Sequence, residues 1–386
     1  MNLSAAFGAG VGVGSSSYLS VKLGQRDYST AQRILGNNIT LNIIIGFIFS
    51  VVSLIFLDPI LYFFGASDQT IPYAREYMII ILLGNIITHL YFGMNAVLRA
   101  ASKPRQAMYT TILTVVLNSI LDPLFIYTFD MGIRGAAIAT ILSQTVALVW
   151  QIRLFSDKGE LLHLKRGIYR LDNIIVKNIL GIGISPFAMN ATACLVSIFV
   201  NQRLLEYGGD LAVGAFGIAN RVAFIFVMIN MGVNQGMQPI AGYNYGAQKY
   251  DRLMRVLTLA MIAGTCVTTS GFIVAEFIPH LCVRLFTNDK VLTDLAVNGI
   301  RIMMAAMPIV GYQMIVTNFF QSIGKAKISI FLSLSRQLLF LVPLIGVMPL
   351  FFGVNGVWVA MPISDSFSAI FALVMMVRYM RVFKKR

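Results

Sequence analysis

Charge is scarce in this chain of 386 residues, and its scarcity excludes an ordinary soluble domain. Charged residues make up only 12% of the positions, whereas hydrophobic residues make up 57%. A soluble globular domain carries roughly 25% charged residues, because its surface must be solvated. The composition therefore predicts an integral membrane protein.

Cysteine and histidine are almost absent. Three of each are scattered along the chain: Cys194, Cys266, Cys282, His89, His163 and His280. Neither set has the spacing of a disulfide framework or of a zinc site, and no hydrolase-type triad is visible. We therefore expect no cofactor, no metal beyond a possible Na⁺, and no enzymatic activity.

Long apolar stretches recur along the whole chain, each of about the 18 to 25 residues that a helix needs to cross a bilayer. We place spans at 3–20, 36–57, 78–98, 107–129, 133–153, 178–202, 211–236, 256–278, 299–321, 328–350 and 353–377. The sequence thus predicts an all-α membrane protein with eleven spans.

The excess of 30 basic over 16 acidic residues gives a net charge of +14, which in a soluble protein would suggest nucleic acid. Here the basic residues alternate between connections, as the positive-inside rule requires. Connections assigned to the cytoplasm hold 23 of the 30, against six on the opposite side. We therefore expect contact with anionic lipid, a cytoplasmic carboxyl terminus and no nucleic acid.

The first and last thirds of the chain repeat one another about 222 positions apart. Gly10, Gly14, Gly24, Tyr28 and Arg33 recur as Gly232, Gly236, Gly246, Tyr250 and Arg255. One position out of step, "GIRGAAIATILS" from 132 falls on "GVNGVWVAMPIS" from 353. A period this long indicates duplication of a whole lobe. We predict an amino-terminal lobe at 1–153, a cytoplasmic linker at 154–177, partly an amphipathic helix, and a carboxy-terminal lobe at 178–386.

The repeat also indicates an incomplete first lobe. The span at 178–202 precedes the second copy of residues 3–20, and its counterpart would lie before residue 1. We therefore expect two pseudo-symmetric six-helix lobes, with the first helix of lobe one missing.

Asp122 is the leading candidate for chemistry, because charges inside spans are costly and default to functional hypotheses. It lies in "LNSILDPLF", with Asn118 one helical turn earlier on the same face. Pro123 removes a backbone donor, so the carbonyl of residue 119 is exposed. These oxygens suit a hard cation or a proton. Thr140 on the next span either adds a hydroxyl oxygen or bonds back to the carbonyl of residue 136.

The second lobe offers a different set of charges. The positions equivalent to Asn118 and Asp122 are Phe340 and Leu344. Arg336 and Asp365 lie at similar depths on the last two spans, so we predict an ion pair that acts as a structural lock, with a substrate or proton role as the alternative.

Arg221, beside Asn220 within a span, either snorkels or holds an amide network with Gln235.

Methionine and phenylalanine are abundant, at 20 and 27 residues. Thioethers and rings repack easily around varied amphiphiles, although most will serve helix packing or lipid contact. The weakly predicted substrate contacts are Phe187, Met228, Met231 and Met314.

Several motifs give the chain a family resemblance. They are "NSILDP", "GIRGAAIAT", "NQGMQPIAGYNYGAQKYDR", "QSIGKAKISIFLSLSRQ" and "GVNGVWVAMPISD". Together they resemble the multidrug and toxic compound extrusion (MATE) transporters, in particular the MepA-like branch. The resemblance implies a first-lobe cation site that includes Asn118 and Asp122, with Thr140 as a further ligand. A further family acid belongs to the first helix, the one that we expect to be missing here.

The resemblance also implies a bacterial inner-membrane location and a function. We expect a monomeric secondary antiporter that exports small organic cations or drugs in exchange for Na⁺ or H⁺ by alternating access of two lobes. The alternatives are a lipid or lipid-linked oligosaccharide flippase of the same superfamily, for which Arg221 and Arg336 would supply basic groups, and an inactive truncated product.

Overall fold

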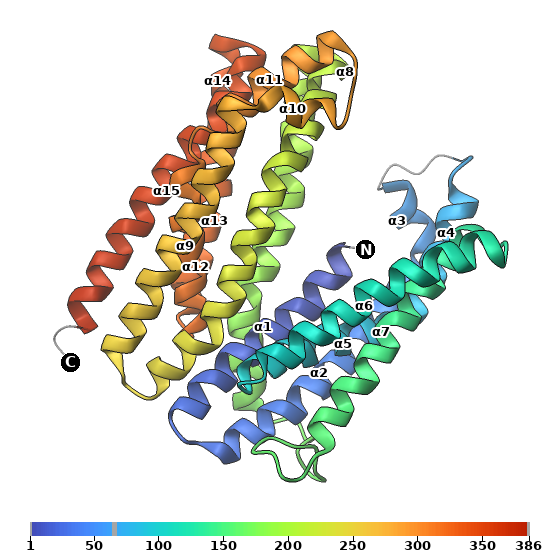
Figure 1. The fold of residues 1–386 in the computed structure, drawn as a ribbon, viewed down its shortest axis with the longest axis vertical. Helices are drawn as coiled ribbons and strands as arrows, with labels where there is room; N and C mark the ends of the chain where they lie inside the picture. Colours follow the sequence, from blue (N-terminus) through green and yellow to red (C-terminus); the bar gives the residue numbers. More distant parts are fainter. Residues whose placement is uncertain (1, 64–67, 384–386) are drawn as a thin grey trace. The chain divides into compact units, whose positions relative to one another are not determined.

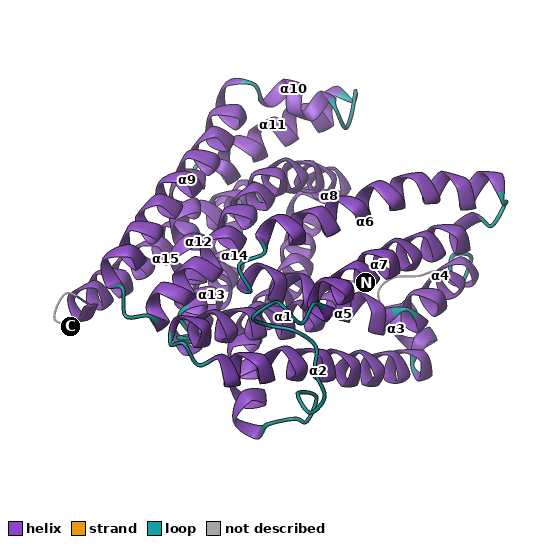
Figure 2. Cartoon of the chain, turned by 60° about the horizontal axis from the view of Figure 1, so that its bottom comes forward, coloured by secondary structure: helices purple, strands orange, loops and turns teal. Residues whose placement is uncertain are grey.

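The computed structural model describes residues 2–63 and 68–383, and within these residues it contains helices and no strand (Figure 2). The chain forms two compact units, Met1–Phe187 and Ala188–Arg386. The predicted lobe boundaries at 153/154 and 177/178 differ from this division, because the linker and the start of the next helix pack with the first unit.

Among its described residues the first unit contains seven α-helices, one π-helical turn and the start of an eighth α-helix. Figure 1 labels the α-helices. In order they are α1 (Asn2–Gly24), α2 (Tyr28–Ile55), α3 (Leu57–Phe63), α4 (Ile71–Leu83), α5 (Asn85–Ala100), α6 (Pro104–Pro123), the π-helix η1 (Leu124–Thr128), α7 (Gly132–Ser156) and α8 (Asn173–Gly246). Its buried core joins α1, α2 and α5, with Leu19, Ile34 and Leu98 fully enclosed.

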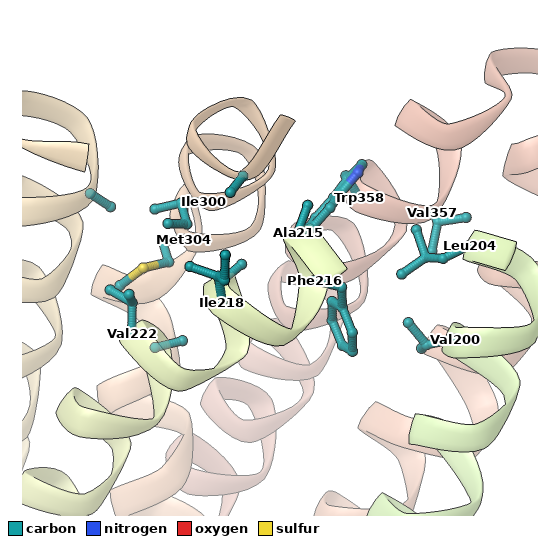
Figure 3. Packing of buried hydrophobic residues seen from close by; sticks show 14 of the residues in the cluster. Val200, Leu204, Ala215, Phe216, Ile218, Val222, Ile300, Met304, Val357 and Trp358 are labelled. Carbon is teal, nitrogen blue, oxygen red and sulfur yellow. The ribbon is translucent and has the colours of Figure 1, made fainter. Parts of the chain in front are cut away.

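The second unit repeats this order as far as α13. It contains the rest of α8, then α9 (Tyr250–Phe277), α10 (Pro279–Arg284), α11 (Lys290–Met304), α12 (Met307–Ser322), α13 (Ala326–Leu334), the π-helix η2 (Ser335–Leu341), α14 (Val342–Phe352) and α15 (Val354–Phe383). In its core the Phe216 ring of α8 meets Trp358 of α15 edge to face at 5.9 Å (Figure 3).

The helix boundaries follow the repeat. Helices α2, α3, α5 and α6 begin 222 residues before α9, α10, α12 and α13. The backbone repeats too, because Arg26 and Gln248, 222 positions apart, both have positive φ (60° and 58°) in the turns after α1 and α8. The two-lobed helical fold predicted from sequence is therefore confirmed, and the lobes share these helix starts and this turn conformation.

The spans are less regular than predicted. The stretches at 78–98 and 299–321 are bent pairs, α4 with α5 at 53° and α11 with α12 at 51°. The stretches at 178–202 and 211–236 belong to α8, which is interrupted only at Gly209, whose φ is 66°. Seven helices are long and apolar enough to cross a membrane, or nine if each bent pair is one span, within the described residues. The count of eleven stays a prediction.

Residues 157–172, which we call the strap, contain only turns, bends and irregular chain, so the expectation of an amphipathic helix is wrong for this segment. Backbone carbonyls and amides of the strap form hydrogen bonds with side chains of α2 instead. Gln32 donates to the carbonyl of His163, and Asn37 donates to the carbonyl of Arg170 at 3.1 Å. The strap is therefore a docked segment rather than a free connection.

The start of α8 is also held against the first unit. Asp172 caps it by accepting from the amides of Ile174 and Ile175 at 2.8 and 3.2 Å. A Cβ at Gly14 of α1 would lie 2.1 Å from the carbonyl oxygen of Ile179, so only glycine permits this approach of the two helices.

Candidate functional site

The candidate cation site lies between α6 and α7, which run side by side in the first unit (Figures 1 and 2). Asn118 and Asp122 occupy successive turns of α6, and Asn118 Nδ2 donates to Asp122 Oδ1 at 3.1 Å. Thr140 of α7 faces them, with its Oγ1 3.5 Å from Asn118 Nδ2. The structure thus brings together the three residues selected from the sequence, and all three are half-buried.

Both predicted roles of Thr140 fit the same geometry. Its hydroxyl donates to the carbonyl of Ala136 at 3.0 Å, which is the back-bond common in membrane helices. That bond uses the hydroxyl proton and leaves an oxygen lone pair on the side of Asn118. The side chain can therefore bond to its own helix and still offer an oxygen to a cation.

A break in α6 fixes the position of this pair. Pro123 ends the helix and has no amide proton to donate to the carbonyl of Ser119. The π-turn η1 follows, closed by the Phe129 amide on the carbonyl of Leu124 at 3.1 Å. Such π-turns are frequent at functional sites. Gly135 allows α7 to approach η1, because a Cβ there would lie 2.8 Å from the Phe125 carbonyl carbon.

Among the residues that the structure describes, Asp122 has no basic counterion. Within residues 2–63 and 68–383 no lysine, arginine or histidine forms an ion pair with its carboxylate. Tyr77 of α4 lies close enough to interact electrostatically with it. A half-buried carboxylate without a cation, beside amide and hydroxyl oxygens, can hold a proton or a hard monovalent ion.

Sequence reasoning missed Tyr77. It interacts electrostatically with Asp122 from another helix, and nothing in the local sequence around it marks that interaction. The described residues contain no group of three His, Cys, Asp or Glu side chains that could hold a metal ion.

In the second unit Arg336 Nε lies 2.8 Å from Asp365 Oδ1, so the expected ion pair forms, whereas its role as a lock stays a prediction. The guanidinium of Arg221 lies 6.0 Å from the ring centroid of Phe286. Arg221 is itself exposed, which suits a snorkelling side chain.

The four weakly predicted substrate residues have different surroundings. Phe187 packs against Phe7, with ring centroids 4.5 Å apart. Met314 packs on the core of the second unit and accepts from Asn230 Nδ2 at 3.5 Å. Met228 and Met231 are 57% and 41% exposed. The substrate role of all four stays a prediction.

Comparison with known proteins decides the family. The profile of the MatE family matches residues 1–124 and 186–345, which is well over half of the chain. The chain belongs to the MATE family. Multidrug export protein MepA of Staphylococcus aureus is 27% identical over 362 residues, which cover 94% of this chain and 80% of that protein.

Solved MATE structures agree with this assignment. The MATE multidrug transporter DinF-BH, solved in complex with a ligand, is 34% identical and superposes with a TM-score of 0.91 over 99% of this chain and 86% of its own. An outward-facing MATE transporter of the MOP superfamily, 24% identical, has a TM-score of 0.94 over 100% and 86% and supports the fold alone. The chain is thus a membrane-spanning transporter of the MATE multidrug-efflux family and not an enzyme.

Proposed function

We propose that this MATE protein is a secondary antiporter that exports small organic cations or drugs in exchange for Na⁺ or H⁺. The observation that carries the proposal is the half-buried Asp122 carboxylate, which has no basic partner among the described residues and lies beside Asn118 and Thr140. A carboxylate that alternately binds and releases a cation can bias the equilibrium between outward-open and inward-open states.

The relatives support multidrug substrates. MepA is a multidrug export protein, and DinF-BH is a multidrug transporter whose structure contains a bound ligand. Because the MepA relatives are bacterial, we place the protein in the bacterial inner membrane. The positive-inside distribution supports a cytoplasmic carboxyl terminus, and we expect the protein to function as a monomer.

The flippase alternative has less support. It would need unpaired basic groups for lipid phosphates, whereas Arg336 is paired with Asp365 and Arg221 lies over Phe286.

Efflux of a fluorescent organic cation from proteoliposomes under separately imposed Na⁺ and pH gradients tests the proposal. Asp122→Asn should abolish gradient-driven efflux, because the amide cannot carry the charge that binds the coupling ion. Asp130→Asn is the matched control: Asp130 is an exposed carboxylate in the turn before α7, and its variant should transport like wild type. Gradient-driven efflux by Asp122→Asn at the wild-type rate would refute the role of Asp122.

A further inference from the structure

The second unit contains an acid on the helices that correspond to the cation site, but that acid already has a cation. Asp365 lies on α15, and only 13% of its side chain is exposed. Arg336 Nε is 2.8 Å from its Oδ1, and Arg336 is the charged group that acts on this carboxylate. Asp122 has no such partner in the part of the chain that the structure describes.

When the two lobes are aligned by the repeat, each residue of this pair lies one helical turn from the position that matches a residue of the first-lobe site. Helices α6 and α13 begin 222 residues apart, and Arg336 corresponds to Thr114, one turn before Asn118. By the one-residue slip that relates α7 to α15, Thr140 corresponds to Met361, and Asp365 lies one turn beyond it. Both lobes therefore carry an intramembrane carboxylate on matching pairs of helices, Asp122 on the first helix of its pair and Asp365 on the second.

A π-helical segment holds Arg336 against α15. Arg336 is the second residue of η2, whereas the matching segment of the first lobe is α-helical. The carbonyl of Arg336 accepts from Ser364 Oγ at 2.7 Å, and Ser364 is only 1% exposed. Because Ser364 and Asp365 are adjacent, α15 holds both the backbone and the guanidinium of Arg336.

Aromatic rings replace the polar ligands. Phe340, which corresponds to Asn118, stacks on Phe367 with centroids 5.6 Å apart and planes at 24°, and lies 5.4 Å from Phe371. These rings offer no oxygen atom to an inorganic ion. The position that supplies the Asn118 amide in the first lobe is thus occupied in the second lobe by a ring that cannot bind an inorganic ion.

We propose that Arg336 is a tethered substitute for the coupling cation. It neutralises Asp365 permanently, so that the second lobe keeps an intramembrane acid but binds no Na⁺ or H⁺ during transport. This inference rests on the proposed function, in which Asp122 binds the coupling ion, and it confines the exchanged cation to the first lobe.

Cation stoichiometry of the purified full chain tests the proposal, measured by ²²Na⁺ binding and by proton uptake. Arg336→Gln should bind about one more cation per chain than wild type. The substitution removes the counterion of Asp365, and a buried carboxylate without a counterion is costly unless it binds Na⁺ or a proton. Arg336→Lys should leave the stoichiometry unchanged. In the Asp122→Asn background Arg336→Gln should restore the binding that Asp122→Asn removes, and adding Asp365→Asn should abolish it again.

Removing the pair as a unit keeps the test decisive if Arg336→Gln fails to fold. Arg336→Gln with Asp365→Asn leaves no unpaired charge, and it should bind as many cations as wild type. Loss of a cation in this double variant would overturn the proposal, as would an unchanged stoichiometry in a folded Arg336→Gln chain. Undiminished binding in Asp122→Asn alone would instead refute the proposed function, so the two failures are distinguishable.

Discussion

Asn37 is one of the side chains that hold the strap, and replacing it by leucine should weaken the docking of the strap on α2. Asn37 is fully buried on α2. Its Nδ2 donates to the carbonyls of Arg33 at 2.9 Å and Arg170 at 3.1 Å, and its Oδ1 accepts from the amide of Asp172 at 2.9 Å. Leucine is similar in size and supplies none of these bonds.

The cost follows from the three strap groups that lose a hydrogen bond to Asn37: the carbonyl of Arg170, the amide of Asp172 and, at the longer distance of 3.5 Å, the carbonyl of Ile168. These bonds are at least partly buried, and each contributes about 0.5–1.5 kcal/mol. For the three together we take about 3 kcal/mol. At about 1.4 kcal/mol per factor of ten, the open strap becomes on the order of 100-fold more populated.

Trypsin cleavage after Arg170 measures this opening. When opening and closing are fast relative to cleavage, the cleavage rate tracks the population of the open form. Asn37→Leu should therefore be cleaved roughly 100 times faster than wild type. Leu259 occupies the matching position of the second lobe and is 58% exposed, so Leu259→Ala is the control and should leave the rate unchanged. Cleavage of Asn37→Leu at the wild-type rate would show that the amide does not hold the strap.

Two further predictions concern stability, each read as the unfolding temperature of the detergent-solubilised protein. Asp27→Ala should cost about 1 kcal/mol by removing the cap of α2, in which Asp27 accepts from the Thr30 amide at 3.1 Å, and Asp27→Asn should cost less. The hydrogen bonds from Thr30 hold the pKa of Asp27 below its ordinary value of 3.8. The contribution of the Asp27 carboxylate to stability is therefore present above that pH and is lost as the pH falls through the lower pKa of the folded state. An equal loss of stability at acid pH in Asp27→Asn would contradict this. Gly311→Ala should cost about 1–3 kcal/mol, because its Cβ would lie 2.2 Å from Thr268 Oγ1 and 2.5 Å from the Gly264 carbonyl oxygen. Gly346→Ala, with open space around it, should stabilise α14 by up to about 1 kcal/mol, and equal effects of the two alanines would refute the packing argument.

The helices could be located from sequence because each is encoded locally. Apolar runs mark the spans, and the recurrence of Gly24 and Tyr28 as Gly246 and Tyr250 indicates the register that the helix ends confirm. The bends could not be predicted in the same way. The break between α4 and α5 falls at Gly84, and no proline marks it within an otherwise continuous apolar run.

The candidate site shows the same division. Asn118 and Asp122 are one turn apart on a single helix, so their spacing predicted the contact. Thr140 was selected as an oxygen on the adjacent helix and lies where a neighbour of Asn118 should. Tyr77 and the docking of the strap depend on contacts between elements far apart in sequence. No periodicity of one segment carries that information.

Because the helix boundaries of the two units match, each lobe can serve as an internal control for the other in saturation mutagenesis. A substitution at a position of α2, α5 or α6 can be scored against the same substitution 222 residues later, in the helix that matches it in order. The costs common to membrane insertion and helix packing then largely cancel in the difference. What remains for each pair of positions is the functional difference between the two lobes, which the proposed confinement of cation binding to the first lobe predicts to be largest around Asp122.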